Sequence, residues 1–166
     1  MTKQQADKWI RFLRSYGPVT INEGMYAENI AKLASSYDIP ELRFPHPLQA
    51  KVFDSIDPSM GVLTNLVLTG TAGDGKTWLC YRLWEKCGGD IAQLNEGLSY
   101  RLLNVETPSG PATIHFIFDL SGLAPDKDQP WEPGRLNLLK QLASSLRGQG
   151  TDYFVVACND GKIVHI

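Results

Sequence analysis

The chain has 166 residues, enough for one compact domain and short for two. Its 43% apolar and 20% charged residues are typical of a globular protein and exclude a disordered or collagen-like chain. The net charge of −2 gives no overall positive field, so DNA as a partner is not supported by net charge and would need a local basic patch.

The first 60 residues are predicted to be helical. Apolar residues at helical spacing indicate a helix over 4–16, and they are Trp9, Phe12, Leu13 and Tyr16. A second helix is expected after Asn22. A third is expected near Pro47, because proline is favourable in a first helical turn. Its expected buried residues are Leu48, Val52, Phe53 and Ile56.

The N-terminal stretch is also the candidate basic patch. Its four cations face a single acidic residue, Asp7, and they are Lys3, Lys8, Arg11 and Arg14. Such a patch could contact nucleic acid, and a solvated helix face explains the same residues.

Strands and helices are expected to alternate in the rest of the chain. Short apolar runs predict strands over 65–69, 100–106, 112–119 and 153–158. Helices are predicted over 76–87, with Leu79, Leu83 and Trp84 inward, and over 134–147. The residues expected in register on the latter are Leu136, Leu139, Leu142 and Leu146. This order predicts an α/β fold in three layers, α/β/α, with a mostly parallel sheet.

Residues 70–77, GTAGDGKT, match the phosphate-loop pattern G-x-x-x-x-G-K-[ST] in full. The motif follows an apolar strand and precedes a helix, so its amides and the helix N-terminus can surround phosphates. Lys76 is expected to reach the β- and γ-phosphates, and Thr77 to offer its hydroxyl to Mg²⁺. The predicted ligand is ATP with magnesium. The predicted nucleotide-binding residues are Gly70, Thr71, Ala72, Gly73, Asp74, Gly75, Lys76, Thr77 and Trp78.

Two polar residues at strand ends complete the predicted site. Asp119 ends the strand 112–119 and is predicted to hold magnesium, although an aspartate there could also cap a turn. Asn159 follows the strand 153–158 and is predicted to position water or touch the γ-phosphate, although Asn-Asp-Gly also forms turns. His46, His115 and His165 are expected to be packed rather than catalytic. The predicted catalytic residues are Lys76, Asp119 and Asn159.

The loop, Asp119 and Asn159, in this order, resemble the AAA+ and related additional-strand P-loop ATPases, with a Walker A loop, a Walker B strand and a sensor-1 residue. The phrases LTGTAGDGKT, FDLSGL and ACNDGK look more narrowly like the bacterial DptF-like ATPases of DNA-phosphorothioation restriction. The resemblance implies ATP hydrolysis coupled to a conformational or assembly change in antiviral defence. It divides the chain into a helical N-terminal segment, 1–45, and a partial P-loop NTPase core, 46–166.

The chain departs from that family pattern in two ways. No Glu lies beside Asp119, and the substitutes considered are Asp126, Asp128 and Glu132. The family's fifth strand, arginine finger, sensor-2 arginine and lid would follow the last residue, so the core is expected to be incomplete at the C-terminus. A homo- or hetero-oligomer, or the remainder of a larger chain, is expected to supply these parts.

Three other functions remain open at this point. Residues 119–122 fit the DxxG motif of GTPases, but Asn159-Asp160-Gly161-Lys162 does not match the guanine-reading NKxD. A small-molecule phosphotransferase needs an arginine-rich lid, which Arg135 and Arg147 do not form. A catalytically impaired, nucleotide-dependent binding module is favoured by the missing Glu. Residues 44–49 are a candidate base-reading segment, in which Gln49 could reach adenine, or an ordinary helix start.

The cysteines and the hydropathy pattern bear on the compartment. The three cysteines, Cys80, Cys87 and Cys158, lack paired spacing, which argues against zinc and against a disulfide framework. No apolar run approaches the roughly 20 residues of a membrane span, and the N-terminus lacks a signal-peptide core. The expectation is a cytoplasmic protein without membrane contact.

Overall fold

The computed structural model describes residues 2–15, 34–39, 45–94, 99–125 and 129–159. The chain divides into two compact units, Met1–Pro45 and His46–Ile166. The helix expected after Asn22, the candidate acids Asp126 and Asp128, and His165 lie outside the described residues. Among the described residues, no helix has the length and apolar character needed to cross a bilayer.

The first unit is organised around α1 (Lys3–Ser15), close to the predicted helix. Thr2 and Gln5 begin it with reciprocal hydrogen bonds between side chain and backbone, a capping box. Phe12 is buried against Ala34 and Ile39, with Trp9 alongside. Leu13, expected on the apolar face, is instead 58% exposed.

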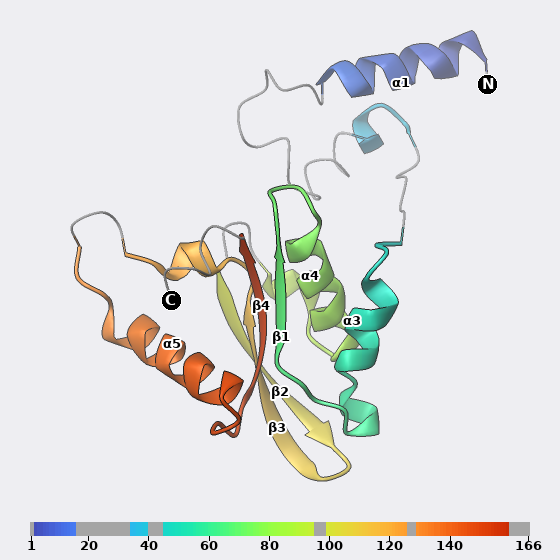
Figure 1. Cartoon of the computed structure of the whole chain (residues 1–166). Coiled ribbons are helices and arrows are strands. Elements are labelled where there is room, and N and C mark those ends of the chain that lie inside the picture. Colours follow the sequence, from blue (N-terminus) through green and yellow to red (C-terminus); the bar gives the residue numbers. More distant parts are fainter. Residues whose placement is uncertain (1, 16–33, 40–44, 95–98, 126–128, 160–166) are drawn as a thin grey trace. The chain divides into compact units, whose positions relative to one another are not determined.

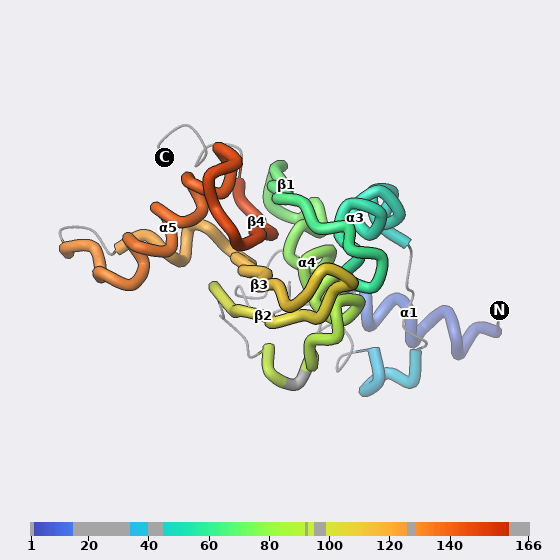
Figure 2. Tube along the Cα trace, turned by 90° about the horizontal axis from the view of Figure 1, so that it is seen from below, coloured from blue at the N-terminus to red at the C-terminus, as the bar shows by residue number. Residues whose placement is uncertain are grey.

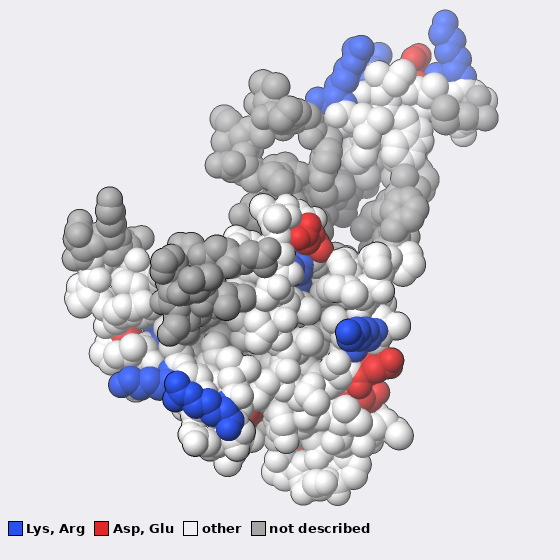
Figure 3. Space-filling view, viewed as in Figure 1, with Lys and Arg blue, Asp and Glu red and all other residues white. Residues whose placement is uncertain are grey.

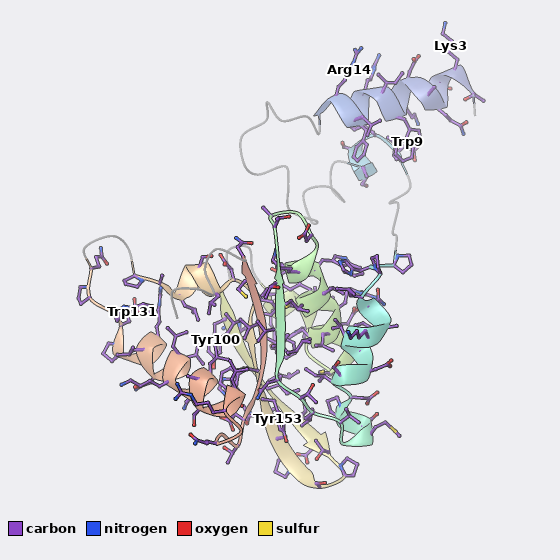
Figure 4. All side chains as sticks on the ribbon, in the orientation of Figure 1. Lys3, Trp9, Arg14, Tyr100, Trp131 and Tyr153 are labelled. Atoms are coloured by element: carbon purple, nitrogen blue, oxygen red, sulfur yellow. The ribbon has the colours of Figure 1, made fainter. Side chains whose placement is uncertain are left out.

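The charged side of α1 lies opposite its packed side. Lys and Arg side chains gather along α1 in the space-filling view (Figure 3). Lys3 and Arg14 project from the side of α1 away from Trp9 (Figure 4). Lys8 pairs with Asp38 at 2.8 Å, which lowers the pKa of that carboxyl through the hydrogen bond and the charge of the lysine. Both explanations of these cations, contact with nucleic acid and a solvated helix face, stay predictions.

The second unit is built on an open four-stranded sheet of order β1-β4-β3-β2 (Figure 1). Its strands are β1 (Leu66–Gly70), β2 (Tyr100–Thr107), β3 (Gly110–Ile117) and β4 (Tyr153–Asn159). β4 pairs in parallel with both β1 and β3, whereas β2 and β3 form an antiparallel hairpin. The prediction of an α/β fold with a mostly parallel sheet is confirmed.

Helices cover the two faces of this sheet (Figure 2). The helices are α3 (Gln49–Ser55), α4 (Lys76–Lys86) and α5 (Pro133–Leu146), with short 3-10 turns at Pro58–Met60, Ile91–Gln93 and Leu120–Leu123. Alternate β4 side chains enter opposite cores: Val155 packs with the α3 and α4 residues, and Phe154 and Val156 pack with α5. Leu79, Leu83 and Trp84 on α4 are buried as predicted.

Two predictions about buried helix faces are confirmed in part: Val52 and Ile56 of the first are buried, as is Leu142 of the second, but other members of each set are exposed. Leu48 is 50% exposed because it lies at the N-cap of α3, before the buried Val52. On α5 the buried residues are Leu138, Leu142 and Ser145, so the predicted leucine stripe contributes Leu142 to the core and Leu139 to its margin. Leu136 and Leu146 are 37% and 52% exposed. The α5 sequence carries two apolar stripes, and only packing against the sheet selects between them.

Lys86 ties the end of α3 to the end of α4. Its ammonium donates to the carbonyl oxygens of Phe53 at 2.6 Å and Ile56 at 3.1 Å. The same ammonium pairs with the Asp57 carboxylate at 3.0 Å. Hydrogen bonds from Ser59 and Lys86 lower the pKa of Asp57 below its ordinary value. These contacts align α3 alongside the helix that follows the phosphate-loop sequence.

A chain of polar groups runs between the sheet and α5. Asn65 donates to the Ser145 carbonyl at 3.0 Å and accepts from the Phe154 amide at 2.9 Å. The Ser145 hydroxyl donates to the Asp152 carbonyl at 2.6 Å. Asp152 in turn binds His115, which is packed and 4% exposed, as expected. Each partly buried polar group in this series of hydrogen bonds therefore has a partner, which offsets the free-energy cost of removing it from water.

Asn65→Ala is expected to lower the free energy of unfolding by about 1–3 kcal/mol, because it leaves the partly buried Phe154 amide without its acceptor, whereas the Ser145 carbonyl oxygen still accepts the Gly148 amide. Urea denaturation measures the effect as a lower midpoint with an unchanged slope. Asn137, exposed on α5, gives the matched control, Asn137→Ala. Equal midpoints for the two variants would contradict the role of the network.

Two thiols, that of Cys80 on α4 and that of Cys87 at its C-cap, are expected to react slowly in the folded protein. Burial raises the pKa of Cys80 to about 12 and that of Cys87 to about 11. Because the thiolate is the reactive form, alkylation at pH 8 should spare Cys80 until urea unfolds the chain. Unfolded thiols ionise near 9.0, so the free energy of unfolding should fall as the pH rises above that value. Mass spectrometry of the alkylated chain checks this, and rapid native labelling of Cys80 would contradict it.

Candidate functional site

The GTAGDGKT segment forms a tight loop between β1 and α4. β1 ends at Gly70, and Gly75 is the N-cap of α4, with a left-handed φ of 75°. Gly73 also has a positive φ, 89°. Gly75 has no side chain to cap the helix, so the first amides of α4 keep their capacity to bind an external acceptor.

Lys76 spans the mouth of the loop. Its ammonium donates to the carbonyl oxygen of Gly70 at 3.1 Å and to that of Thr71. The side chain is half-buried and therefore held over the loop rather than extended into water. This arrangement puts a fixed positive charge beside the amides of the loop.

Asp74 braces the loop from inside its own turn. Its Oδ2 accepts the Thr71 amide at 2.6 Å, and both carboxylate oxygens lie 3.1 Å from the Thr71 hydroxyl. A Cβ at Gly70 would lie 2.4 Å from the same Oδ2, so only glycine leaves room for this contact. The predicted site residues Gly70, Thr71 and Asp74 are thus interlocked.

His46 lies against the loop, although its sequence position suggested only a packed residue. Its Nδ1 accepts the Leu48 amide at 3.1 Å, and its Nε2 lies 2.9 Å from the Asp74 carbonyl oxygen. Because Nδ1 accepts, Nε2 is the nitrogen that donates. The ring also stacks on Trp78, with centroids 6.4 Å apart. No signal in the sequence indicated this contact, since His46 and Asp74 are 28 positions apart.

Trp78 extends the site along the first turn of α4. Its ring is half-buried between His46 and Arg82, whose guanidinium carbon lies 5.9 Å from the ring centroid. Gln49, the candidate adenine contact, is the first residue of α3. Of the proposed base-reading segment, His46 thus contacts the first turn of α4, and the role of Gln49 stays a prediction.

Thr77 connects the loop to the strand that precedes Asp119. Its hydroxyl donates to the Phe118 carbonyl oxygen at 3.3 Å. Asp119 is exposed at the end of this strand and caps the turn at Leu120–Leu123, where its Oδ1 accepts the Ser121 amide at 2.9 Å. Asp119 thus caps the turn with one of its carboxylate oxygens. Its role in binding magnesium stays a prediction.

Asn159 lies across from the first residue of the loop. It is the exposed last residue of β4 and is in register with Gly70 on β1. The strand ends carrying Gly70, Asn159 and Asp119 therefore meet at one edge of the sheet. The loop residues Ala72 and Gly73 are exposed at the same edge.

Glu132, one candidate for the missing catalytic glutamate, is engaged elsewhere. Its carboxylate pairs with Arg135 at 2.9 Å and is 68% exposed. Arg135 also donates to the Gly122 carbonyl oxygen at 3.1 Å. These contacts link α5 to the turn after Asp119, and they give Glu132 a structural partner.

The predicted magnesium site consists of two oxygen groups, the Thr77 hydroxyl and the Asp119 carboxylate. Among the residues that the structure describes, no three His, Cys, Asp or Glu side chains are close enough to hold a metal alone. Mg²⁺ is usually held by one or two protein oxygens together with phosphate oxygens and water. The Thr77 hydroxyl and the Asp119 carboxylate are donors of that kind.

Gly75→Ala is expected to destabilise the protein by about 1–2 kcal/mol, because the Cβ of alanine is sterically unfavourable in the left-handed backbone conformation. Its Cβ would also lie 3.0 Å from Cδ2 of His46. Gly134→Ala is the control, since a Cβ there meets nothing within 4 Å. Urea denaturation compares the two variants. If Gly75→Ala is as stable as Gly134→Ala, the loop does not need this conformation.

Comparison with known proteins leaves the site to be interpreted from its own chemistry. No family model, no curated protein and no solved structure matches the chain. The arrangement of the loop, Lys76, Thr77 and Asp119 is therefore the basis for any functional conclusion.

Proposed function

We propose that the chain is an ATP-binding P-loop NTPase domain that works as a magnesium-dependent switch or motor subunit. The observation that carries this proposal is the loop itself: Lys76 bridges its mouth, and Thr77 touches the strand that leads to Asp119. A cation, free helix amides and two oxygen donors on adjoining elements are the groups that a triphosphate with magnesium needs.

The strand order supports the ATPase class over other P-loop classes. β4 lies between β1 and β3, so an extra strand separates the loop strand from the acid-bearing strand. This position fits the additional-strand class that the motifs resemble. It also puts Asn159 between the loop and Asp119, where an amide can orient a water molecule near the terminal phosphate.

Each proposed site residue has a distinct task. The loop amides bind the phosphates, and Lys76 neutralises charge on the β- and γ-phosphates. Thr77 and Asp119 would hold magnesium, which when bound bridges phosphate oxygens and offsets their charge. Asn159 would orient the attacking water.

Rapid hydrolysis would need groups from elsewhere. The described residues beside Asp119 supply no catalytic glutamate, since Glu132 pairs with Arg135. A partner subunit in a homo- or hetero-oligomer, or another part of a larger chain, would supply the missing catalytic groups. The proposed compartment is the cytoplasm, and the proposed biological setting is antiviral DNA defence. Without it, the domain would be a nucleotide-dependent binding module.

A GTPase is the second candidate, and two observations favour it. The hairpin of β2 and β3 leads directly into Asp119-Leu120-Ser121-Gly122. A Cβ at Gly122 would lie 2.1 Å from the Ser99 hydroxyl, so a larger residue at this DxxG position would displace the Ser99 side chain. The position of β4 argues for ATP, and calorimetry with ATP and GTP decides between them. A clear preference for GTP would overturn the proposal.

Lys76→Ala is expected to weaken ATP binding by about 10- to 150-fold, because charge-assisted hydrogen bonds contribute about 1.5–3 kcal/mol each. The fold should be retained, since the loop and not the core loses a contact. Calorimetry with magnesium and a non-hydrolysable ATP analogue measures the affinity. Lys140→Ala, at an exposed position of α5, is the control.

Unaltered affinity for ATP in Lys76→Ala would count against the assignment of Lys76 to the site.

A phosphate-release assay of the unmodified chain, with and without DNA, separates an active ATPase from a binding module. Release indicates an ATPase, whereas saturable binding without release indicates a binding module.

A further inference from the structure

Asp74 and His46 together hold the loop in its curl without any ligand. Asp74 closes the turn from inside, through the Thr71 amide at 2.6 Å. His46 holds the same residue from outside, through the Asp74 carbonyl oxygen at 2.9 Å. One residue of the loop is therefore fixed at both its side chain and its backbone.

The histidine is itself anchored. The Leu48 amide donates to Nδ1, which leaves Nε2–H aimed at the loop. Stacking on Trp78 fixes the plane of the ring, and its edge would lie 3.0 Å from a Cβ at Gly75. His46 precedes α3, whose far end Lys86 ties to α4. The attachment of α3 to α4 therefore helps to fix the position of His46 beside the start of α4.

We propose that His46 and Asp74 form a clip that preorganises the loop for phosphate, and that both are positioning residues. This inference rests on the proposed function. A loop that is already curled loses little conformational freedom when phosphate binds, so the affinity is higher than that of a loose loop. The clip acts on the polyphosphate and not on the base.

The Asp74 carboxylate has two opposing effects that variants can separate. Its hydrogen bond to Thr71 braces the loop, while its negative charge repels an incoming phosphate. Asp74→Asn keeps an acceptor for the Thr71 amide and removes the charge. Asp74→Ala removes both. The two variants carry the same charge, so their difference in affinity reports the brace alone.

The experiment measures binding of ATP and of inorganic tripolyphosphate, each with magnesium, to the full chain by calorimetry. Asp74→Ala is expected to bind both ligands about 2- to 12-fold more weakly than Asp74→Asn, the equivalent of one hydrogen bond. Asp54→Ala, exposed on α3, is the control and should match the unmodified chain.

The histidine is tested by removing its donor and then restoring one. His46→Phe keeps an aromatic ring against Trp78 and loses the hydrogen bond to Asp74, so both ligands should bind about 2- to 12-fold more weakly. His46→Gln supplies an amide donor and should recover most of the affinity. Circular dichroism and urea midpoints establish that the variants are folded.

The possible outcomes separate the two proposals. If the unmodified chain binds neither ligand, the proposed function fails and the clip with it. If it binds both but the neutral Asp74 variants are equal and His46→Phe has full affinity, only the clip is overturned. If His46→Phe loses ATP and keeps tripolyphosphate, His46 serves the base, and the clip is again overturned.

Discussion

Parallel pairing holds β4 between β1 and β3, and the candidate site takes its geometry from that pairing. The register sets Gly70 opposite Asn159 and brings the end of β3, with Asp119, to the same edge. Because alternate β4 side chains enter opposite cores, the strand cannot shift by one residue without exchanging its two buried faces. The chemistry at the strand ends is thus fixed by packing in the middle of the sheet.

Much of this unit could be predicted because its signals are local. Each strand is a short apolar run, and the turn between β1 and α4 is encoded by glycines and Lys76 within eight residues. The inward face of α4 followed from Leu79, Leu83 and Trp84 in the same way. The roles of Lys76, Thr77, Asp119 and Asn159 in nucleotide chemistry remain predictions.

The remaining features depend on contacts between distant residues, which spacing does not reveal. His46 meets Asp74 across 28 positions, and Asn65 meets Ser145 across 80. The α5 sequence offers two apolar stripes, and contact with the sheet decides which is buried. Asp119 could cap a turn or bind a metal, and both choices use the same residue type. Local pattern thus predicted which elements form, and tertiary contact decided how they face one another.

The buried ring of His115 has a consequence of its own. Nδ1 lies 2.8 Å from the Tyr100 hydroxyl, Nε2 lies 3.0 Å from the Asp152 carboxylate, and Phe154 stacks on the ring at 4.5 Å. An ionised carboxylate only accepts, so Nε2 carries a proton and Nδ1 can accept from tyrosine. Turning the imidazole over would put carbon atoms where Nδ1 and Nε2 now lie, which would break both hydrogen bonds. Its ring proton should therefore exchange slowly with solvent, giving nuclear magnetic resonance a sharp internal marker of whether β2, β3 and β4 remain assembled.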